Sequence, residues 1–359
     1  MTMTTTAACI HAPAAGADLE KSTVIRRDLR PDDCLVEIRW SGICHSDIHT
    51  VNGDWPHENF PMAPGHEIVG TVVETGAGVT RHAVGDVVGI GCMVDSCGDC
   101  ASCEAGEENY CLNGLTGTYN SIDRHDGTVT QGGYSTHIVC REDFLIRMPA
   151  VDGGLDGATM AAMTPLLCAG ITTYSPLKHW GVGPGSRVAV VGMGGLGHVA
   201  VQIAAALGAE VTVFSHGTSK KEDGLRFGAS SYVATGGDAA DTFHRDHADE
   251  FDLILNTVSA TLPVHRYLSM LAPDGTLVML GLPPEGMSVR ANQLTGRRRS
   301  LAGSNIGGIA ETQEMIDFCA AHGITAEIEL VSADEVNDAY RRVLGSEVRY
   351  RAVIDARTI

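Results

Sequence analysis

A glycine-rich turn between a strand-like and a helix-like segment constrains the fold of this chain most strongly. Residues 187–191 (RVAVV) predict a short buried strand, residues 192–197 (GMGGLG) form the turn, and residues 196–207 have helical character. Strand-like and helix-like segments then alternate, at residues 211–215, 221–227, 253–255, 263–271 and 276–280. Alternation at this spacing predicts a parallel sheet with crossover helices.

The same turn predicts a dinucleotide site. Where such a turn follows a strand and opens a helix, its glycines shape the turn, admit the pyrophosphate to the backbone and let helix and strand pack closely. The helix N-terminus then faces the phosphates. Because glycines also occur at ordinary turns, the position between strand and helix carries the prediction. The expected cofactor contacts in the turn are Gly192, Gly194, Gly195, Leu196 and Gly197.

The end of the following strand predicts NADP(H) rather than NAD(H). NAD sites commonly place an Asp or Glu there for the ribose hydroxyls. This chain instead has Ser215 and His216, followed by Lys220 and Lys221. The missing carboxylate removes repulsion of a 2′-phosphate, and a lysine attracts it. Solvated surface lysines are the alternative interpretation of this segment.

Four cysteines predict a metal-binding segment, here called the zinc lobe (residues 92–115). Cys97, Cys100, Cys103 and Cys111 follow the spacing C-x2-C-x2-C-x7-C, which is typical of tetrahedral structural zinc. Two disulfides are the less favoured alternative, because no secretion signal is recognisable in the threonine-rich residues 1–8. An iron–sulfur cluster would commonly place the fourth cysteine four positions after the third and follow it with proline, whereas Leu112 follows here.

Length and charge limit the remaining possibilities. The 359 residues suffice for two domains. A formal net charge of −19 makes nucleic acid a poor partner. The uncharged stretches 157–177 and 188–209 contain prolines or glycines and polar residues, so we expect buried elements and no membrane span. A reducing, cytoplasmic location is expected, where eleven cysteines favour metal binding over disulfides.

Three separated segments predict a second metal site. They are residues 42–49 (GICHSDIH), 65–67 (GHE) and 165–170 (PLLCAG). Each alone is weak evidence, since an isolated cysteine or histidine is more often structural. Together Cys44, His66 and Cys168 make a Cys, His, Cys set, which is a catalytic zinc type with a fourth position open.

These segments occur in the order found in one known family. With residues 304–308 (SNIGG) and 348–351 (VRYR), the chain resembles the zinc-dependent medium-chain alcohol dehydrogenases from about residue 8 to its end. It is most similar to the cinnamyl alcohol dehydrogenase-like, NADP-dependent aldehyde reductases. The resemblance implies a GroES-like, partly open β-barrel catalytic domain at 1–167 and 308–359, and a Rossmann domain of doubly wound α/β type at 168–307. It also implies an active site between the domains and a homodimer formed through an edge strand near residues 300–303.

The resemblance implies a role for each matching residue. Cys44, His66 and Cys168 would bind catalytic zinc, with Glu67 able to replace a bound water, and Asp47 would orient the histidine ligand. Ser46 and His49 would form a proton relay through the cofactor ribose, and Cys97, Cys100, Cys103 and Cys111 would bind structural zinc. Further cofactor contacts would be His45, Thr172, Ser215, His216, Lys220, Lys221, Thr257, Gly281 and Asn305.

The predicted function is hydride transfer between NADP(H) and an aldehyde or primary alcohol that is aromatic, allylic or medium-chain aliphatic. Plant enzymes of lignin synthesis carry bulky aromatics near positions that are Gly117 and Asn305 here, so we expect a differently shaped pocket. Trp55 is expected either to line this pocket or to lie at the surface or an interface. The alternatives are reduction of a C=C or C=N bond, an NAD-linked polyol enzyme, a non-catalytic nucleotide sensor and an iron–sulfur electron carrier.

Overall fold

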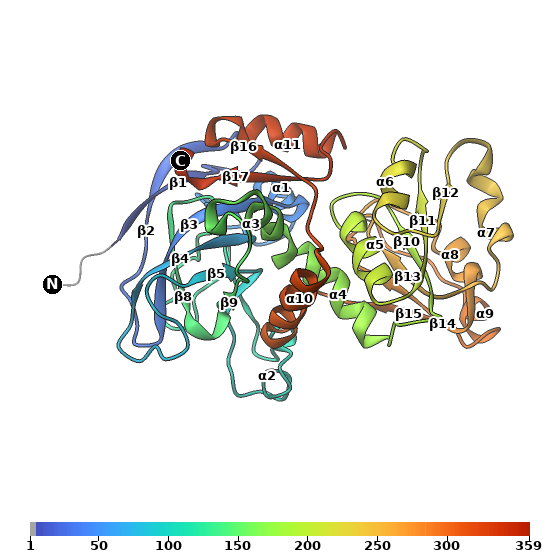
Figure 1. Ribbon diagram of the computed structural model, residues 1–359, viewed down its shortest axis with the longest axis horizontal. Coiled ribbons are helices and arrows are strands. Elements are labelled where there is room, and N and C mark those ends of the chain that lie inside the picture. The colour runs from blue at the N-terminus through green and yellow to red at the C-terminus, as the bar shows by residue number, and fades with distance from the viewer. Residues whose placement is uncertain (1–4, 284) are drawn as a thin grey trace. The chain divides into compact units, whose positions relative to one another are not determined.

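The computed structural model describes residues 5–283 and 285–359, and the chain divides into two compact units (Figure 1). Unit 1 comprises Met1–Cys168 and Gly307–Ile359, and unit 2 comprises Ala169–Ile306. These limits differ by one residue from the predicted domain limits. Each unit has its own sheet and core, and each is described by itself below.

Unit 2 is built on a parallel sheet. Its strands are β10 (Arg187–Val191), β11 (Glu210–Ser215), β12 (Ser231–Ala234), β13 (Phe251–Asn256), β14 (Leu271–Met279) and β15 (Ser300–Gly303). Its helices are α4 (Ala169–His179), α5 (Gly197–Ala206), α6 (Lys221–Arg226), α7 (Phe243–Asp246), α8 (Val264–Met270) and α9 (Ala291–Thr295). The strand order is β12-β11-β10-β13-β14-β15, and every pair is parallel.

This strand order places a binding site at β10. The chain winds from β10 to β12 in one direction and then returns to β13 on the other side, so the order reverses between β10 and β13. In doubly wound sheets, ligands bind at such a reversal, outside the carboxyl ends of the strands. Val188, Ala189 and Val190 of β10 are fully buried, as expected for a central parallel strand covered on both faces.

Unit 1 is built on a mainly antiparallel sheet with the order β16-β17-β3-β4-β5-β9, in which β8 also pairs with β3. Its strands are β1 (Thr6–His11), β2 (Glu20–Ile25), β3 (Asp33–Ile43), β4 (Ile68–Thr75), β5 (Val87–Ile90), β6 (Met93–Asp95), β7 (Thr116–Gly117), β8 (His137–Arg141), β9 (Ile146–Arg147), β16 (Ile328–Val331) and β17 (Arg351–Asp355). Its helices are α1 (His45–Asn52), α2 (Ala101–Glu104), α3 (Ala158–Met163), α10 (Ile309–His322) and α11 (Val336–Leu344).

The C-terminal part of the chain completes the sheet of unit 1. Strand β17 pairs antiparallel with β3, with Ala352 opposite Ile43, so the last strand lies beside the strand that leads into α1 (Figure 1). Helix α11 contributes Val336, Ala339 and Tyr340 to the same buried core as Ile43. The elements after residue 307 therefore support the segment that carries Cys44.

Two uncharged stretches fold as short internal elements. Residues 157–177 form α3, the 3₁₀ helix η4 (Thr164–Leu167) and most of α4, and residues 188–209 form β10, the glycine turn and α5. Among residues 5–283 and 285–359, no helix is both long and apolar enough to cross a membrane.

Strand β3 differs from its sequence pattern. The alternation at residues 36–40 predicts a half-exposed strand, but Arg39 is only 6% exposed. Its guanidinium bonds Asp156 and Asp355 and lies 3.4 Å from the ring centre of Trp40. Ion pairing compensates the charge of Arg39, so this residue is buried at a position that the pattern assigns to solvent.

Other boundaries also shift. The sequence of residues 132–139 (GGYSTHIV) predicts a strand, but β8 begins only at His137. Gly132 and Gly133 instead donate backbone bonds to Ala63 and Gly65, which holds this segment against the chain that carries His66. The sequence of residues 333–344 (ADEVNDAYRRVL) predicts one helix, but the segment begins with a 3₁₀ turn, η6 (Ala333–Glu335), before α11.

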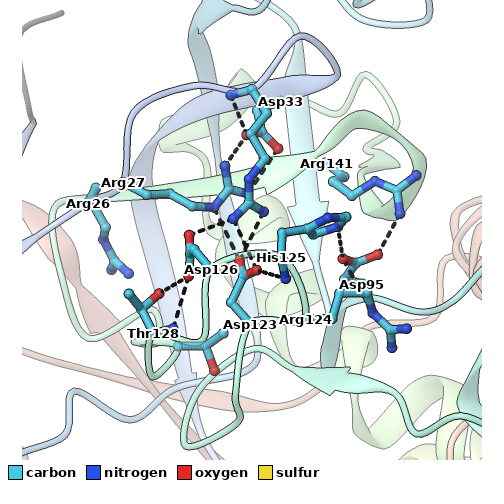
Figure 2. A network of polar contacts seen from close by, with 12 residues as sticks. Arg26, Arg27, Asp33, Asp95, Asp123, Arg124, His125, Asp126, Thr128 and Arg141 are labelled. Carbon is cyan, nitrogen blue, oxygen red and sulfur yellow. Dashed lines mark hydrogen bonds and ion pairs between the residues drawn. The ribbon is translucent and has the colours of Figure 1, made fainter.

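An ion-pair network holds the turn at residues 123–128 against the sheet of unit 1 (Figure 2). Asp123 accepts two bonds of 3.0 Å from Arg30, and Arg27 pairs with the fully buried Asp33. Asp95, the last residue of β6, accepts bonds from Arg141 and His125. The network therefore links the turn to β6, a strand of the zinc lobe.

Candidate functional site

The four cysteines of the zinc lobe come together as a metal would require. The Sγ of Cys103 lies 3.5 Å from that of Cys100 and 3.9 Å from that of Cys97. Tetrahedral zinc with Zn–S bonds of about 2.3 Å places sulfur atoms about 3.8 Å apart. Backbone amide donors at Cys103 and Leu112 lower the pKa of the Cys100 thiol to about 6, which favours the thiolate that binds metal. All eleven cysteines are free in the described structure.

A second group unites residues that lie far apart in the sequence. Cys44 follows β3, His66 and Glu67 precede β4, and Cys168 follows η4. One ligand atom from each of these four buried residues lies within 4.8 Å of the others. Two thiols, an imidazole and a carboxylate are ligands that zinc accepts. The donor set thus fits a buried zinc ion, and all four residues belong to unit 1.

Asp47 holds two of these segments in register. Its Oδ1 accepts bonds from the backbone N–H of Gly65, at 3.1 Å, and from Nδ1 of His66, at 2.9 Å. Its Oδ2 accepts the backbone N–H of Cys44, at 2.9 Å. The bond to Nδ1 leaves Nε2 of His66 for a metal, an arrangement common behind histidine ligands.

Glu67 is paired with an arginine that the sequence interpretation did not assign. The Oε1 of Glu67 accepts a bond from Arg351, which also donates to the carbonyl of Ile43 at 2.9 Å. Burial raises the pKa of Glu67 to about 7, although the charge of Arg351 opposes this shift. The buried Oε2 has no hydrogen-bond partner in the described residues, as expected of an atom that can face a metal. A Cβ at Gly42 would lie 2.1 Å from this oxygen, so glycine there leaves room for it.

The predicted relay residues lie on α1. Ser46 is half-buried, and Nδ1 of His49 lies 2.8 Å from Oδ2 of Asp54, a partner that the sequence analysis missed. The ring of Trp55 is half-buried, 5.5 Å from the ring of His49. No signal in the sequence marks this pair, because Asp54 lies in the loop after α1, five residues after His49.

Tyr119 adds an aromatic ring beside the candidate metal ligands. Its ring stacks on His66 with a centroid distance of 5.9 Å, and its hydroxyl donates to Oγ1 of Thr50 at 3.2 Å. Gly117, the predicted pocket residue, lies two positions earlier in the short strand β7. The sequence analysis did not select Tyr119, since an aromatic residue in a loop has no distinctive pattern.

The glycine turn has the geometry expected of a dinucleotide site. Gly192 has a positive φ of 96°, which L residues rarely adopt. A Cβ at Gly197 would lie 1.9 Å from the carbonyl oxygen of Gly192, so this glycine permits helix and strand to pack. A Cβ at Gly194 would meet no heavy atom of the described structure within 4 Å, which leaves this position open to a ligand.

Several predicted cofactor contacts surround the turn. The Nζ of Lys220 donates to the carbonyl of Met193 at 2.9 Å, and Oγ1 of Thr257 donates to the carbonyl of Val191 at 2.8 Å. Ser215 ends β11, and a Cβ at Gly281 would lie 2.2 Å from the carbonyl of Val258. The remaining predicted contacts are His216 and Lys221, both exposed, Thr172, buried in α4, Asn305, exposed after β15, and His45, exposed at the start of α1 in unit 1.

Known proteins resemble both parts of the chain. Residues 30–150 match the family model of the alcohol dehydrogenase GroES-like domain, and residues 195–321 match that of the zinc-binding dehydrogenases. The NADP-dependent alcohol dehydrogenase C 1 of Mycolicibacterium smegmatis is 54% identical over 355 residues, which cover 99% of each chain. The chain belongs to the zinc-dependent alcohol dehydrogenase family. Its predicted family, fold class and enzyme class are thereby confirmed.

Other members of the zinc-dependent alcohol dehydrogenase family agree over the whole length. The aldehyde reductase YahK of Escherichia coli is 46% identical and covers 98% of each chain. The cinnamyl alcohol dehydrogenase structure from Sorghum bicolor has a TM-score of 0.92 at 39% identity, covering 98% of each chain. The Helicobacter pylori structure, a cinnamyl alcohol dehydrogenase complexed with NADP(H), has a TM-score of 0.90 at 37% identity over 99% of each chain. Zinc is therefore favoured over the iron–sulfur alternative.

Proposed function

We propose that this chain is a zinc-dependent, NADP(H)-linked alcohol dehydrogenase that works as an aldehyde reductase. The observation that carries the proposal is the buried group of Cys44, His66 and Cys168 with Asp47 behind the histidine. Relatives that share 54% identity over the full length are NADP-dependent alcohol dehydrogenases, and a 46% identical relative is an aldehyde reductase. Unit 1 would supply the catalytic metal site, and unit 2 would bind the dinucleotide.

Each metal-binding side chain receives a role in this proposal. Cys44, His66 and Cys168 would hold the catalytic zinc, and Glu67 would reach it when other ligands leave. When bound, zinc supplies a Lewis acid that polarises the carbonyl of the aldehyde. Asp47 keeps the ring of His66 in a single orientation, because both its oxygens accept bonds from the ligand-bearing segments. Cys97, Cys100, Cys103 and Cys111 would hold a second, structural zinc.

Ser46 and His49 would supply the proton that completes the reduction. The oxygen of the product needs one proton after hydride arrival, and a side-chain hydroxyl within reach can donate it. His49 would complete this relay through Nε2, because its Nδ1 is bonded to Asp54. Asp54 orients the imidazole through Nδ1, and the ring of His49 is partly exposed to solvent.

The glycine turn and Lys220 would select NADP(H). Gly192, Gly194 and Gly197 give the backbone the turn, the open approach and the close packing that a pyrophosphate needs. Strand β11 ends at Ser215 without a carboxylate, and Lys220 lies beside the turn. A lysine at this position favours the 2′-phosphate of NADPH electrostatically.

The proposed substrates are aromatic, allylic or medium-chain aliphatic aldehydes. The ring of Tyr119 against His66 supplies an apolar surface beside the metal ligands. We place the protein in the cytoplasm. The exposed edge of β15 would form a homodimer interface. A monomer mass in light scattering would refute the dimer.

Product analysis with cinnamaldehyde and NADPH tests the reaction class. The proposal expects the unsaturated alcohol, because zinc chemistry acts on the carbonyl. Saturated aldehyde would instead favour reduction of the C=C bond on the same scaffold. Metal analysis tests the ligands, because Cys44→Ser should lose one of two zinc ions and all turnover. If the zinc-loaded wild type instead binds NADPH tightly without any turnover, a nucleotide sensor is favoured.

A further inference from the structure

The carboxylate of Asp47 has one more donor, which comes from outside the metal-binding segments. The hydroxyl of Tyr134 lies 3.3 Å from Oδ2 of Asp47, and the hydroxyl of Tyr340 lies 3.4 Å from that of Tyr134. We propose that Tyr134 is a positioning residue for the catalytic metal, and that the two hydroxyls connect helix α11 to the metal site. The inference rests on the proposed zinc ligands.

The place of Tyr134 in the network explains how it acts. Oδ2 of Asp47 also accepts the backbone N–H of Cys44, at 2.9 Å, while Oδ1 accepts Nδ1 of His66. A donor on Oδ2 therefore fixes the rotation of a carboxylate that is bonded to two proposed ligands. Asp47 and Tyr134 are both fully buried, so water does not replace a lost hydroxyl easily.

The backbone and ring of Tyr134 hold its hydroxyl in place. Its N–H donates to the carbonyl of Pro64 at 2.9 Å, and its carbonyl accepts from Ile10 at 2.8 Å. The ring lies against Gly65, where a Cβ would be only 2.5 Å from Cδ1 of Tyr134. Tyr134 thus packs on the residue that precedes His66, and a phenylalanine would keep this packing while losing the hydroxyl.

The order of the hydroxyls gives the bonds a direction. The oxygens of an ionised carboxylate only accept, so Tyr134 donates to Asp47 and accepts from Tyr340. Burial, followed by the charge of Asp47, raises the pKa of Tyr134 well above its usual value, which keeps its proton available for donation. Tyr340 is 7% exposed and belongs to α11, and its ring meets that of Tyr134 edge-on at 6.4 Å.

Loss of the Tyr134 hydroxyl should weaken zinc binding at the catalytic site. Removing partners behind metal ligands commonly costs 10- to 100-fold in metal affinity or activity, and a 3.3 Å bond is long, so we expect about tenfold for Tyr134→Phe. Tyr340→Phe removes a bond one step further away and should cost about threefold or less. Tyr267→Phe, which alters a buried tyrosine in unit 2, serves as the matched control.

Zinc titration of the metal-free protein against a chromophoric chelator tests the inference. The zinc lobe provides an internal reference, because its affinity should be the same in all variants. We expect Tyr134→Phe to weaken one of the two sites, and to shift the visible d–d bands of the cobalt-substituted site. We expect Tyr267→Phe to show neither the weakened zinc binding nor the shifted cobalt bands.

Three outcomes would contradict the reasoning, and they are distinguishable. If wild type binds two zinc ions and Tyr134→Phe matches it in affinity and cobalt spectrum, the inference about Tyr134 is wrong. If Tyr267→Phe loses as much affinity as Tyr134→Phe, the effect is a general response to a lost buried hydroxyl. If wild type binds zinc only in the zinc lobe, the ligand assignment is wrong, and the inference is overturned with it.

Discussion

The buried pair of Arg351 and Glu67 should be one of the most sensitive points of unit 1. The side chains of Arg351 and Glu67 are 4% and 0% exposed, and Arg351 also donates to the carbonyl of Ile43. Replacing Arg351 with methionine keeps much of the volume but leaves the carboxylate of Glu67 buried without its cation. Breaking a buried pair from one side costs about 3–5 kcal/mol, so Arg351→Met should lower the free energy of unfolding by that amount.

A double variant separates the lost charge pairing from lost packing. Glu67→Gln in the Arg351→Met background removes the unpaired charge while keeping the shape that Gly42 accommodates. The double variant should recover more than half of the lost stability, because a neutral amide is much less costly to bury than a carboxylate. Packing losses, in contrast, would remain in the double variant.

Urea unfolding followed by circular dichroism measures these free energies. The experiment is done with excess chelator, since a bound zinc ion would offer Glu67 a second cation. Arg357→Met is the control, because its side chain is 61% exposed and its removal should change stability little. A loss below about 1 kcal/mol for Arg351→Met, or a double variant no more stable than the single one, would refute the reasoning.

Three further substitutions test the cofactor site, the relay and the zinc lobe. Lys220→Ala should raise the KM for NADPH about tenfold while leaving that for NADH nearly unchanged, and an equal rise for both in initial-rate assays would contradict a 2′-phosphate contact. Ser46→Ala should lower kcat about 100-fold with little change in NADPH binding by fluorescence titration, and wild-type turnover at neutral pH would remove Ser46 from the relay. Gly308→Ala should destabilise the protein by about 1–3 kcal/mol, because a Cβ there would lie 1.8 Å from the carbonyl oxygen of Gly106. Gly183→Ala, with no described atom within 4 Å of the new Cβ, is its control in thermal unfolding, and equal Tm values would contradict the close approach.

Local patterns in the sequence predicted much of the fold. The strand, glycine turn and helix around Gly192 depend on residues within about twenty positions, and the structure forms β10 and α5 there. Cysteine and histidine are sparse and chemically distinctive, so Cys44, His66 and Cys168 could be selected although only folding brings them together. The order of these segments along the chain carried the resemblance to a known family, which the matches to two family models confirm.

Long-range contacts could not be predicted in the same way. Arg351 meets Glu67 across 284 positions, and Tyr340 meets Tyr134 across 206, so neither pair leaves a local pattern. Arg39 shows the related limit of periodicity, because two carboxylates from distant segments compensate its burial in β3. Residues 132–134 do not extend β8, because the backbone N–H groups of Gly132, Gly133 and Tyr134 bond to the segment before His66.

The central claim is that zinc in the Cys44, His66 and Cys168 site and NADPH together reduce an aldehyde. The most direct test is the initial rate of cinnamaldehyde reduction with NADPH and with NADH, measured on native, zinc-stripped and zinc-restored protein. The account predicts turnover that prefers NADPH, disappears with the metal and returns with zinc. Equal rates in the stripped protein, or no turnover in a folded protein loaded with two zinc ions, would contradict it.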